Sequence, residues 1–520
     1  MNILLLHPPQ AKPSEPPAGL PLLASALRAR GCNCTLCDLN IEGVHYLLEQ
    51  AHPATDTWSK RAAKNRQRNL EALNNPATYD NLSKYARAVT DINKLIDNAG
   101  KACGANVSLA NYGEKNLSPL KSEELIQAAA DYRKNLYYPF FSKRLASLIE
   151  QHSIESVGIS LNFLSQALCS FAIIGYLREH YPGIRIILGG GLVTTWLQSP
   201  HNQNGQNLFS GLVDNMVAGP GENLLPELLG LNSQHARFCP DYSDFLDYRY
   251  LSPGFVLPYA TSTGCFWRKC LFCPETSEQN PYHPVSCATV LQEVQQLSKQ
   301  TSPSLIHFLD NAVSPAVLKG LADTPPTDRN GTPVPWYGFV RFTKQLADVD
   351  FCRRLRASGC LMLKLGLESG SQDVLNEMEK GIDLQLVRKV LPALHQAGIM
   401  TYVYLLFGTP GESLAEARQT MAFTSEFHKE ITFLNLAIFN LPLGSPQLKD
   451  LDIQNFYEGD LSIYSDFKHP RGWARKEIRR FLDNEFRRDP KLLRILQNDP
   501  TLFTSNHAAL FHNQLMGYKA

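Results

Sequence analysis

The sequence predicts an α/β protein: a doubly wound, Rossmann-like N-terminal domain with a helical insertion, then a partial (βα)6 TIM-like barrel and a helical C-terminal region. The chain has 520 residues, which is too long for one ordinary core, so we expect about two or three domains. Short apolar runs alternate with segments of helical period in both halves of the chain. The composition, 44% hydrophobic and 19% charged, is that of a soluble globular protein.

The opening of the chain predicts a strand, a helix and a second strand. Residues 2–6 form a mostly apolar run that ends at His7-Pro8-Pro9, as expected of a buried parallel strand stopped by proline. Residues 19–30 carry leucine and alanine at helical spacing, and residues 34–39 supply the next strand. These elements are the start of a doubly wound α/β unit.

Residues 41–150 interrupt this pattern and are predicted to be an inserted helical subdomain, because they are polar and have helical spacing. Their basic stretch, residues 59–68, is expected to be a solvated helix face, with a partner or substrate surface as the alternative. The α/β pattern then resumes, with strands expected at 156–161 and 184–188 and one more strand, with a glycine turn, over 213–222. The Rossmann-like domain is therefore predicted over residues 1–230, followed by a linker over 231–254 that is rich in proline, tyrosine and aspartate.

Cys32, Cys34 and Cys37 could mark a metal cluster in the first domain. In a strand, however, Cys32 and Cys34 share one face while Cys37 points to the other. Buried cysteine is also a common small hydrophobic residue. We therefore interpret these three residues as core thiols.

Strand and helix patterns alternate through residues 255–445. Strands are expected at 257–263, 305–309, 336–342, 361–367, 400–407 and 433–439. Helices are expected near 286–299, 314–323, 348–358, 384–397 and 413–428. Six parallel strands with outer helices make a partial barrel, in which reactive groups lie at the carboxyl ends of the strands.

Residues 446–520 lose the alternation and are predicted to be helical. Basic residues outnumber acidic ones over 468–494. Because aromatic residues are few there, we interpret this stretch as a solvated face rather than a nucleic-acid site.

Composition also limits the functional classes. A net charge of +1 gives no overall field that would favour nucleic acid or a membrane surface. No run approaches the ~20 apolar residues of a membrane helix, and no basic leader precedes the first strand, so a cytoplasmic protein is expected. Twelve irregularly spaced cysteines favour reduced thiols and a metal site over disulfides.

The strongest chemical signal is G-C-F-W-R-K-C-L-F-C at residues 264–273, which places Cys265, Cys270 and Cys273 close together. A structural zinc site would need a fourth ligand and usually a second paired ligand set. A plant-type two-iron site has the same C-x4-C-x2-C spacing and a distant fourth cysteine, and the candidates are Cys287, Cys352 and Cys360. The strand–helix repeat that follows does not resemble a small electron carrier, which favours an iron–sulfur cube with one open iron.

Four motifs together resemble the radical S-adenosylmethionine (radical SAM) enzymes, in the branch with an N-terminal cobalamin-binding domain. The first is the cysteine motif, in which the first gap is one residue longer than the family's commonest C-x3-C-x2-C spacing. The others are H-F-L-D-N at 307–311, L-K-L-G-L-E-S-G-S at 363–371 and Y-L-L-F-G-T-P-G-E at 404–412. Their order and spacing match the family.

The resemblance implies a 4Fe-4S cluster held by the three cysteines, with S-adenosylmethionine bound at its open iron. It places Phe272 near the adenine, Asp310 and Asn311 near the methionine amino group, and Glu368 and Ser369 near ribose or methionine polar groups; Phe407 and Gly408 would pass the adenine with their backbone. The alternative for Asp310 is a helix cap or turn residue. For Glu368 it is an ion pair with Arg341 or Lys364.

The resemblance also implies cobalamin in the first domain. Ser160, Gly189 and Gly190 have the separation of that domain's serine and double-glycine motifs, and Gly219 and Glu222 lie in a further loop at a strand end. The family's usual D-x-H-x-x-G is absent, so cobalamin would lack a histidine lower ligand. The alternative is a domain that has lost cobalamin and only shapes the substrate pocket.

The implied reaction is reductive cleavage of S-adenosylmethionine to a 5′-deoxyadenosyl radical, with cobalamin-dependent methyl transfer to an unactivated carbon of an organic substrate. The alternative uses the same radical for rearrangement, cyclisation or oxidative bond cleavage without methyl transfer. Either reaction needs an electron donor such as flavodoxin or ferredoxin. The non-enzyme alternative is an iron–sulfur electron carrier or sensor.

Overall fold

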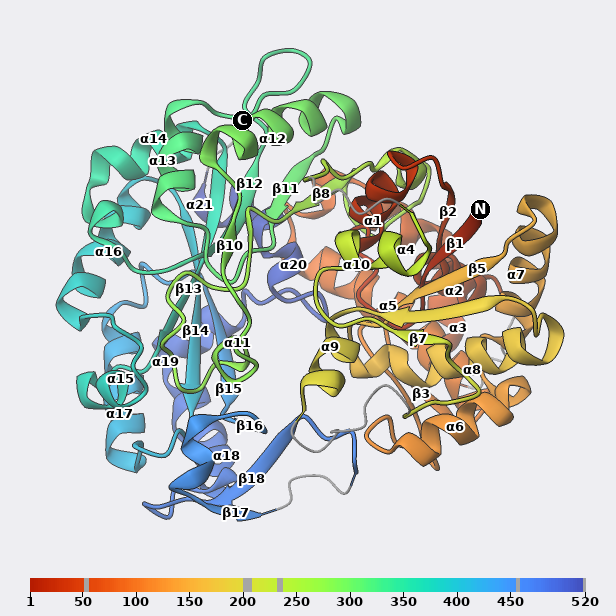
Figure 1. Ribbon diagram of the computed structural model, residues 1–520. Coiled ribbons are helices and arrows are strands. Elements are labelled where there is room, and N and C mark those ends of the chain that lie inside the picture. Colours follow the sequence, from red (N-terminus) through yellow and green to blue (C-terminus); the bar gives the residue numbers. More distant parts are fainter. Residues whose placement is uncertain (51–55, 200–207, 232–236, 455–458, 518–520) are drawn as a thin grey trace. The chain divides into compact units, whose positions relative to one another are not determined.

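The computed structural model describes residues 1–50, 56–199, 208–231, 237–454 and 459–517 (Figure 1). The chain forms two compact units. Unit 1 comprises Met1–Asn74, Tyr85–Ser252 and Tyr457–Ile463, and unit 2 comprises Asn75–Lys84, Pro253–Phe456 and Tyr464–Ala520. Most of the expected linker thus groups with unit 1, and most of the expected C-terminal region with unit 2.

Unit 1 is built on a parallel sheet in the order β2-β1-β5-β6-β7. Its strands are β1 (Asn2–His7), β2 (Asn33–Asp38), β5 (Ser156–Ser160), β6 (Arg185–Gly189) and β7 (Asn215–Met216). The helices of this α/β core are α1 (Gly19–Arg28), α8 (Leu164–His180), α9 (Gly191–Gln198) and α10 (Gly221–Leu228). The strand order reverses between β1 and β5, and such a switch point is where doubly wound sheets bind ligands.

The insertion between β2 and β5 is mainly helical. Its α-helices are α2 (Leu39–Glu49), α3 (Thr57–Lys64), α4 (Arg66–Leu73), α5 (Leu82–Ala102), α6 (Ser122–Ala130) and α7 (Tyr138–His152), and its 3₁₀ helices are η1 (Pro76–Thr78) and η2 (Tyr132–Lys134). It also contains an antiparallel hairpin of β3 (Ala105–Val107) and β4 (Tyr112–Glu114), which the prediction of a helical insertion did not include. Three-residue strands are too short for alternation to reveal them.

Unit 2 contains a six-stranded parallel sheet in the order β15-β14-β13-β12-β11-β8, which confirms the expected partial barrel (Figure 1). The strands are β8 (Val256–Tyr259), β11 (Leu305–Phe308), β12 (Trp336–Val340), β13 (Cys360–Glu368), β14 (Met400–Phe407) and β15 (Phe433–Ile438). The connecting helices are α11 (Pro274–Ser277), α12 (Cys287–Thr301), α13 (Pro315–Asp323), η5 (Lys344–Ala347), α14 (Val349–Ala357), α15 (Gln372–Glu377), α16 (Leu384–Gln396) and α17 (Leu414–Glu426).

The first barrel strand is shorter than the sequence indicates. We expected one strand over 257–263, but β8 stops at Tyr259, and β9 (Ser262–Thr263) pairs instead with β10 (His283–Pro284) in an antiparallel bridge. The chain turns there because Thr261 and Ser262 bond to a carboxylate from the next strand, Asp310.

The C-terminal region is not wholly helical, which corrects the sequence-based expectation. It contains α18 (Arg475–Asn484), α19 (Pro490–Leu496), α20 (Ser505–Ala508) and α21 (His512–Met516), with 3₁₀ helices η6 (Pro446–Lys449), η7 (Phe486–Arg488) and η8 (Ala509–Phe511). It also contains β17 (Asp452–Gln454) and β18 (Tyr464–Lys468), which form an antiparallel sheet with β16 (Leu441–Pro442), a strand just before this region. Across the described ranges of the chain, no helix combines the length and apolar character needed to cross a membrane.

Candidate functional site

The loops that follow the strands of unit 2 bring the expected residues to one edge of the sheet. The strands are parallel, so their carboxyl ends face the same way. The cysteine loop follows β8 and β9, Asn311 follows β11, Glu368 ends β13 and Gly408 follows β14. Arg341, which the sequence analysis considered only as an alternative partner of Glu368, directly follows β12 at this edge.

Cys265 and Cys273 are partly exposed, whereas Cys270 is buried, and all three thiols are free. Burial raises the pKa of Cys273 to about 11. Burial also raises the pKa of Cys270, against the opposing effect of the nearby Lys380 and Arg341 cations. Metal binding would have to overcome this cost of forming thiolates, as cysteine ligation generally does.

Within the described ranges, no three His, Cys, Asp or Glu side chains converge on a position for one metal ion. A tetrahedral zinc site needs such convergence. In a 4Fe-4S cube each cysteine binds a different iron, so three thiols can hold the cube without meeting at one point. The three residues present fit the cube better than they fit zinc.

The cysteines considered as a fourth ligand lie elsewhere in unit 2. Cys360 begins β13, at the opposite edge of the sheet from the cysteine loop, and is fully buried. Cys352 is buried in α14, where its thiol bonds to the carbonyl of Leu346. The Cys287 thiol bonds to the carbonyl of Ala316. These placements do not favour a plant-type two-iron site.

Asp310 is almost fully buried, and its carboxylate holds the turn after β8. It accepts hydrogen bonds from the Thr261 backbone N–H at 2.9 Å, the Thr261 hydroxyl at 2.7 Å and the Ser262 hydroxyl at 2.6 Å. These bonds occupy three of the about four lone-pair sites of the carboxylate, as expected of the turn residue that was the alternative for Asp310. Asn311 is exposed and donates from its side chain to the Gly264 carbonyl at 3.4 Å, next to Cys265.

Glu368 forms a buried ion pair, but with neither of the two expected partners. Its Oε1 lies 2.7 Å from Nζ of Lys380, and both side chains are 11% exposed. Glu368 has a left-handed φ of +65°, and the β13–β14 register shifts between Gly366 and Glu368. Left-handed backbone in a residue other than glycine is strained, and such strain clusters at functional sites. Lys380 lies twelve residues after Glu368 in the sequence. This separation does not match the side-chain spacing of a helix or a strand, so the sequence alone could not predict the pair.

The other expected S-adenosylmethionine residues differ in exposure. The Phe272 ring is partly exposed and lies 5.3 Å from the Lys380 ammonium. Ser369 is fully buried and its hydroxyl bonds to that of Thr420 on α17, at 3.1 Å. Phe407 is fully buried against the rings of Phe481 and Phe486. Phe272 is therefore partly accessible, whereas the side chains of Ser369 and Phe407 are not.

In unit 1, the expected cobalamin residues meet at the carboxyl ends of β5 and β6. Ser160 and Gly189 are register partners. The Asn162 side chain joins them, because it donates to the Ser160 hydroxyl at 3.1 Å and accepts from the Gly191 N–H at 3.0 Å. Asn162 was not named among the candidate site residues, although it lies in the loop that follows a predicted strand.

The two neighbouring glycines are needed for different reasons. A Cβ on Gly190 would lie 2.4 Å from the Leu161 carbonyl oxygen, so the chain itself requires glycine there. A Cβ on Gly189 would lie at an ordinary 3.7 Å from Val217, so the fold does not require glycine at this position. A bare backbone there leaves room for a large ligand, which fits cobalamin.

The remaining expected residues also lie at this edge of the unit 1 sheet. Gly219 has a φ of +78° and its N–H bonds to the Thr194 hydroxyl at 2.9 Å, while Glu222 lies in the first turn of α10. His7 ends β1 at the switch point but is only 6% exposed. Burial lowers the pKa of His7, with Asp38 opposing the shift. A histidine this deeply buried is poorly placed to bind cobalt.

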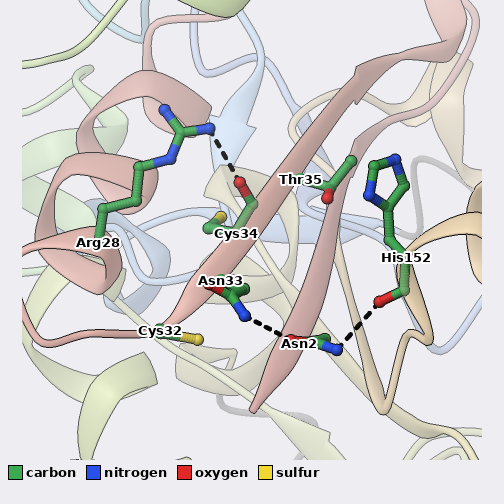
Figure 2. Close-up of a pocket in the computed structure, with 7 residues that line it drawn as sticks. All are labelled: Asn2, Arg28, Cys32, Asn33, Cys34, Thr35 and His152. Atoms are coloured by element: carbon green, nitrogen blue, oxygen red, sulfur yellow. Dashed lines mark hydrogen bonds between the residues drawn. The ribbon is translucent and has the colours of Figure 1, made fainter.

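A pocket of about 390 Å³ lies at the amino ends of β1 and β2 (Figure 2). Its polar groups are largely bonded to one another: Asn33 donates to Asn2, and Arg28 donates to the Cys34 carbonyl at 2.8 Å. Burial raises the pKa of Cys34 to about 12, and Cys37 is fully buried, as expected of core thiols. This pocket is at the opposite edge of the sheet from Ser160 and Gly189.

No family model matches this chain. Among curated proteins, it is 25% identical over 207 residues to the tryptophan 2-C-methyltransferase of Streptomyces laurentii. That match covers 37% of this chain and only 34% of the relative's length.

Two solved structures share the fold over most of the chain. One is the radical S-adenosylmethionine methyltransferase TsrM from Kitasatospora setae, with a TM-score of 0.55 and 15% identity over 88% of this chain and 79% of that chain. The other is the cobalamin-dependent S-adenosylmethionine radical enzyme OxsB, with a TM-score of 0.59 and 11% identity over 93% of this chain and 67% of that chain.

Those structures contain the ligands that the sequence motifs implied. OxsB has aqua-cobalamin and S-adenosylmethionine bound, and a second TsrM structure, with a TM-score of 0.50, has cobalamin and a 4Fe-4S cluster bound. The chain therefore has the fold of the radical SAM enzymes that carry an N-terminal cobalamin-binding domain. The resemblance that the four motifs indicated is confirmed at the level of this fold.

Proposed function

We propose that this chain is a cobalamin-dependent radical SAM enzyme that transfers a methyl group to an unactivated carbon of a small organic substrate. When bound, the cluster supplies one electron for cleavage of S-adenosylmethionine to methionine and a 5′-deoxyadenosyl radical, and cobalamin supplies a carrier for the methyl group. The protein's part is to bind, orient and shield these groups.

The observation that carries the proposal is the placement of three free thiols at the carboxyl edge of a partial barrel, in the loop after its first strand. Cys265, Cys270 and Cys273 would hold the cluster. The Arg341 guanidinium donates to the Cys270 sulfur at 3.9 Å, and such hydrogen bonds tune the potential of a cluster. Asn311 and the Glu368–Lys380 pair supply polar groups beside this loop for the amino, carboxylate and ribose groups of S-adenosylmethionine.

The methyl-transfer part of the proposal is supported by unit 1. Ser160, Asn162 and Gly189 lie together at the carboxyl ends of neighbouring strands, next to the switch point of the sheet. Two of the matched proteins, the Streptomyces laurentii relative and TsrM, carry methyltransferase in their names, and one TsrM structure has tryptophan bound. Tryptophan is therefore the first substrate to try, and an electron-donor protein such as flavodoxin or ferredoxin is the expected partner.

The experiment uses cluster-loaded protein under anaerobic conditions, with S-adenosylmethionine labelled in its methyl group and titanium citrate as reductant. Reactions with and without hydroxocobalamin, and with and without tryptophan, are analysed by mass spectrometry. S-adenosylhomocysteine that forms only with cobalamin, together with label in tryptophan or another acceptor, supports methyl transfer. Cobalamin-independent 5′-deoxyadenosine without S-adenosylhomocysteine would replace the proposal with the rearrangement class, and the absence of both products would contradict it.

A further inference from the structure

The cysteine loop, residues 264–273, lacks regular backbone structure and depends on its neighbours for its shape. Gly264 and Arg268 both have left-handed φ values, of +72° and +51°. The first cysteine gap is also one residue longer than the commonest spacing and contains Trp267. An irregular loop that must hold three ligands needs supporting contacts to fix them.

Three consecutive carbonyls of one turn accept hydrogen bonds from this loop or from Arg341. The Met378 carbonyl accepts from the Leu271 N–H at 3.1 Å, and the Glu379 carbonyl accepts from the Trp267 indole at 3.0 Å. The Lys380 carbonyl accepts from the guanidinium of Arg341. Residues 378–381, which we call the docking turn, connect α15 to α16.

Gly381 completes the docking turn by making room for the indole ring. A Cβ at this position would lie 1.9 Å from Cζ2 of Trp267, a distance that no packing tolerates. The glycine also has a left-handed φ of +65°. The ring of Trp267 therefore lies directly against the backbone of the docking turn.

Arg341 connects the docking turn with the buried cysteine. Its guanidinium lies 4.3 Å from the centre of the Trp267 ring, a cation–π distance, and donates to the Cys270 sulfur at 3.9 Å. Lys380, which belongs to the docking turn, forms an ion pair with Glu368 through its side chain, at 2.7 Å. One turn thus contacts the loop and carries the partner of Glu368.

We propose that Trp267, Arg341 and Gly381 are positioning residues, which dock the cysteine loop on residues 378–381 and so hold Cys270 beside the Glu368–Lys380 pair. This inference rests on the proposed function, because it assumes that the loop carries a cluster. It assigns a role to the longer first gap, since Trp267 supplies a contact between that gap and a separate turn of the barrel.

The test compares Gly381→Ala and Trp267→Ala with a matched control, Gly331→Ala. Gly331 also has a left-handed φ, of +83°, but a Cβ there would meet nothing within 4 Å. After reconstitution with iron and sulfide, the rate at which bathophenanthroline disulfonate removes iron is measured, and circular dichroism checks folding. We expect both docking variants to lose iron about tenfold faster than wild type, and Gly331→Ala to match wild type.

The double variant Trp267→Ala/Gly381→Ala should lose iron no faster than the worse single variant, because both changes break one contact. Trp267→Phe keeps an aromatic ring but removes the indole N–H and the second fused ring, and should accelerate the loss about threefold, even if Gly381→Ala fails to fold. Iron loss at the wild-type rate from folded Trp267→Ala and Trp267→Phe would overturn the docking role. A wild-type protein that takes up no iron would instead contradict the proposed function.

Discussion

Glu412 is a carboxylic acid that the fold keeps away from water, behind the loop that follows β14. It is fully buried, and its Oε2 accepts from the Gly408 N–H and from the Trp473 indole, the latter at 2.9 Å. Its Oε1 has no hydrogen-bond partner among the described residues. Burial, the largest effect, raises the pKa of Glu412 from its ordinary 4.5 to about 7, although both hydrogen bonds oppose the shift.

We expect the unfolding free energy of the protein to fall as the pH rises from 4.5 to 7, because of the proton that Glu412 retains in the folded state. The folded chain retains the Glu412 proton in that range, whereas the unfolded chain releases it, so the loss reaches about 3 kcal/mol above pH 7. Glu412→Gln should abolish that contribution. The measurement is the difference in unfolding free energy between variant and wild type from pH 5 to 8.5; a difference that does not change with pH would contradict the account.

At the level of elements, the turn from β6 into α9 shows how two adjacent glycines differ. Gly190 has a φ of +111° and no room for a side chain, whereas a Cβ on Gly189 would make only an ordinary contact with Val217, at 3.7 Å. The fold therefore requires glycine at the first position but not at the second.

We expect Gly190→Ala to destabilise unit 1 by at least about 1–3 kcal/mol, from its backbone conformation alone. Gly189→Ala should change stability by less than about 0.5 kcal/mol and reduce the cobalamin retained after desalting. Thermal unfolding and the absorbance of bound cobalamin measure the two effects. Normal cobalamin content in Gly189→Ala would argue against the assignment of this edge.

The strands of both sheets could be predicted from the sequence because buried parallel strands are continuous apolar runs. The cysteines and Gly189 could be proposed because their motifs are local. Arg341 and Lys380 could not be paired with Cys270 and Glu368, because those contacts join residues from different loops. The hairpin β3–β4 and the strands β16, β17 and β18 were missed because short strands leave no periodic signal.

At the scale of the whole molecule, unit 2 includes a short segment from the N-terminal half, Asn75–Lys84. Within it, Tyr79 is 2% exposed and lies 5.5 Å from the ring of Phe511 and 5.8 Å from that of His507. Ala508 and Ala509, from the same C-terminal segment, are buried in a core cluster with Val256 and Leu305 of the first two barrel strands. Residues distant in sequence thus complete the core of the barrel unit.

We expect Phe511→Ala to lower the unfolding free energy of unit 2 by about 3–5 kcal/mol, and Tyr79→Ala to have a comparable effect. The combined loss should be smaller than the sum because the two rings are in contact. Hydrogen exchange resolved by unit is the measurement, and Leu493→Ala, at an exposed position of unit 2, is the control. Strictly additive losses would show that the two segments do not share a core.

The proposed function requires one chain to hold both an iron–sulfur cube and cobalamin. The most direct measurement is the iron and cobalt content of protein purified without oxygen, reconstituted with iron, sulfide and hydroxocobalamin, and desalted. Wild type should hold about four irons and close to one cobalamin. Cys270→Ala should lose the iron but keep the cobalamin, while Cys287→Ala keeps both. Two irons, bound zinc, or iron that survives Cys270→Ala would contradict the account.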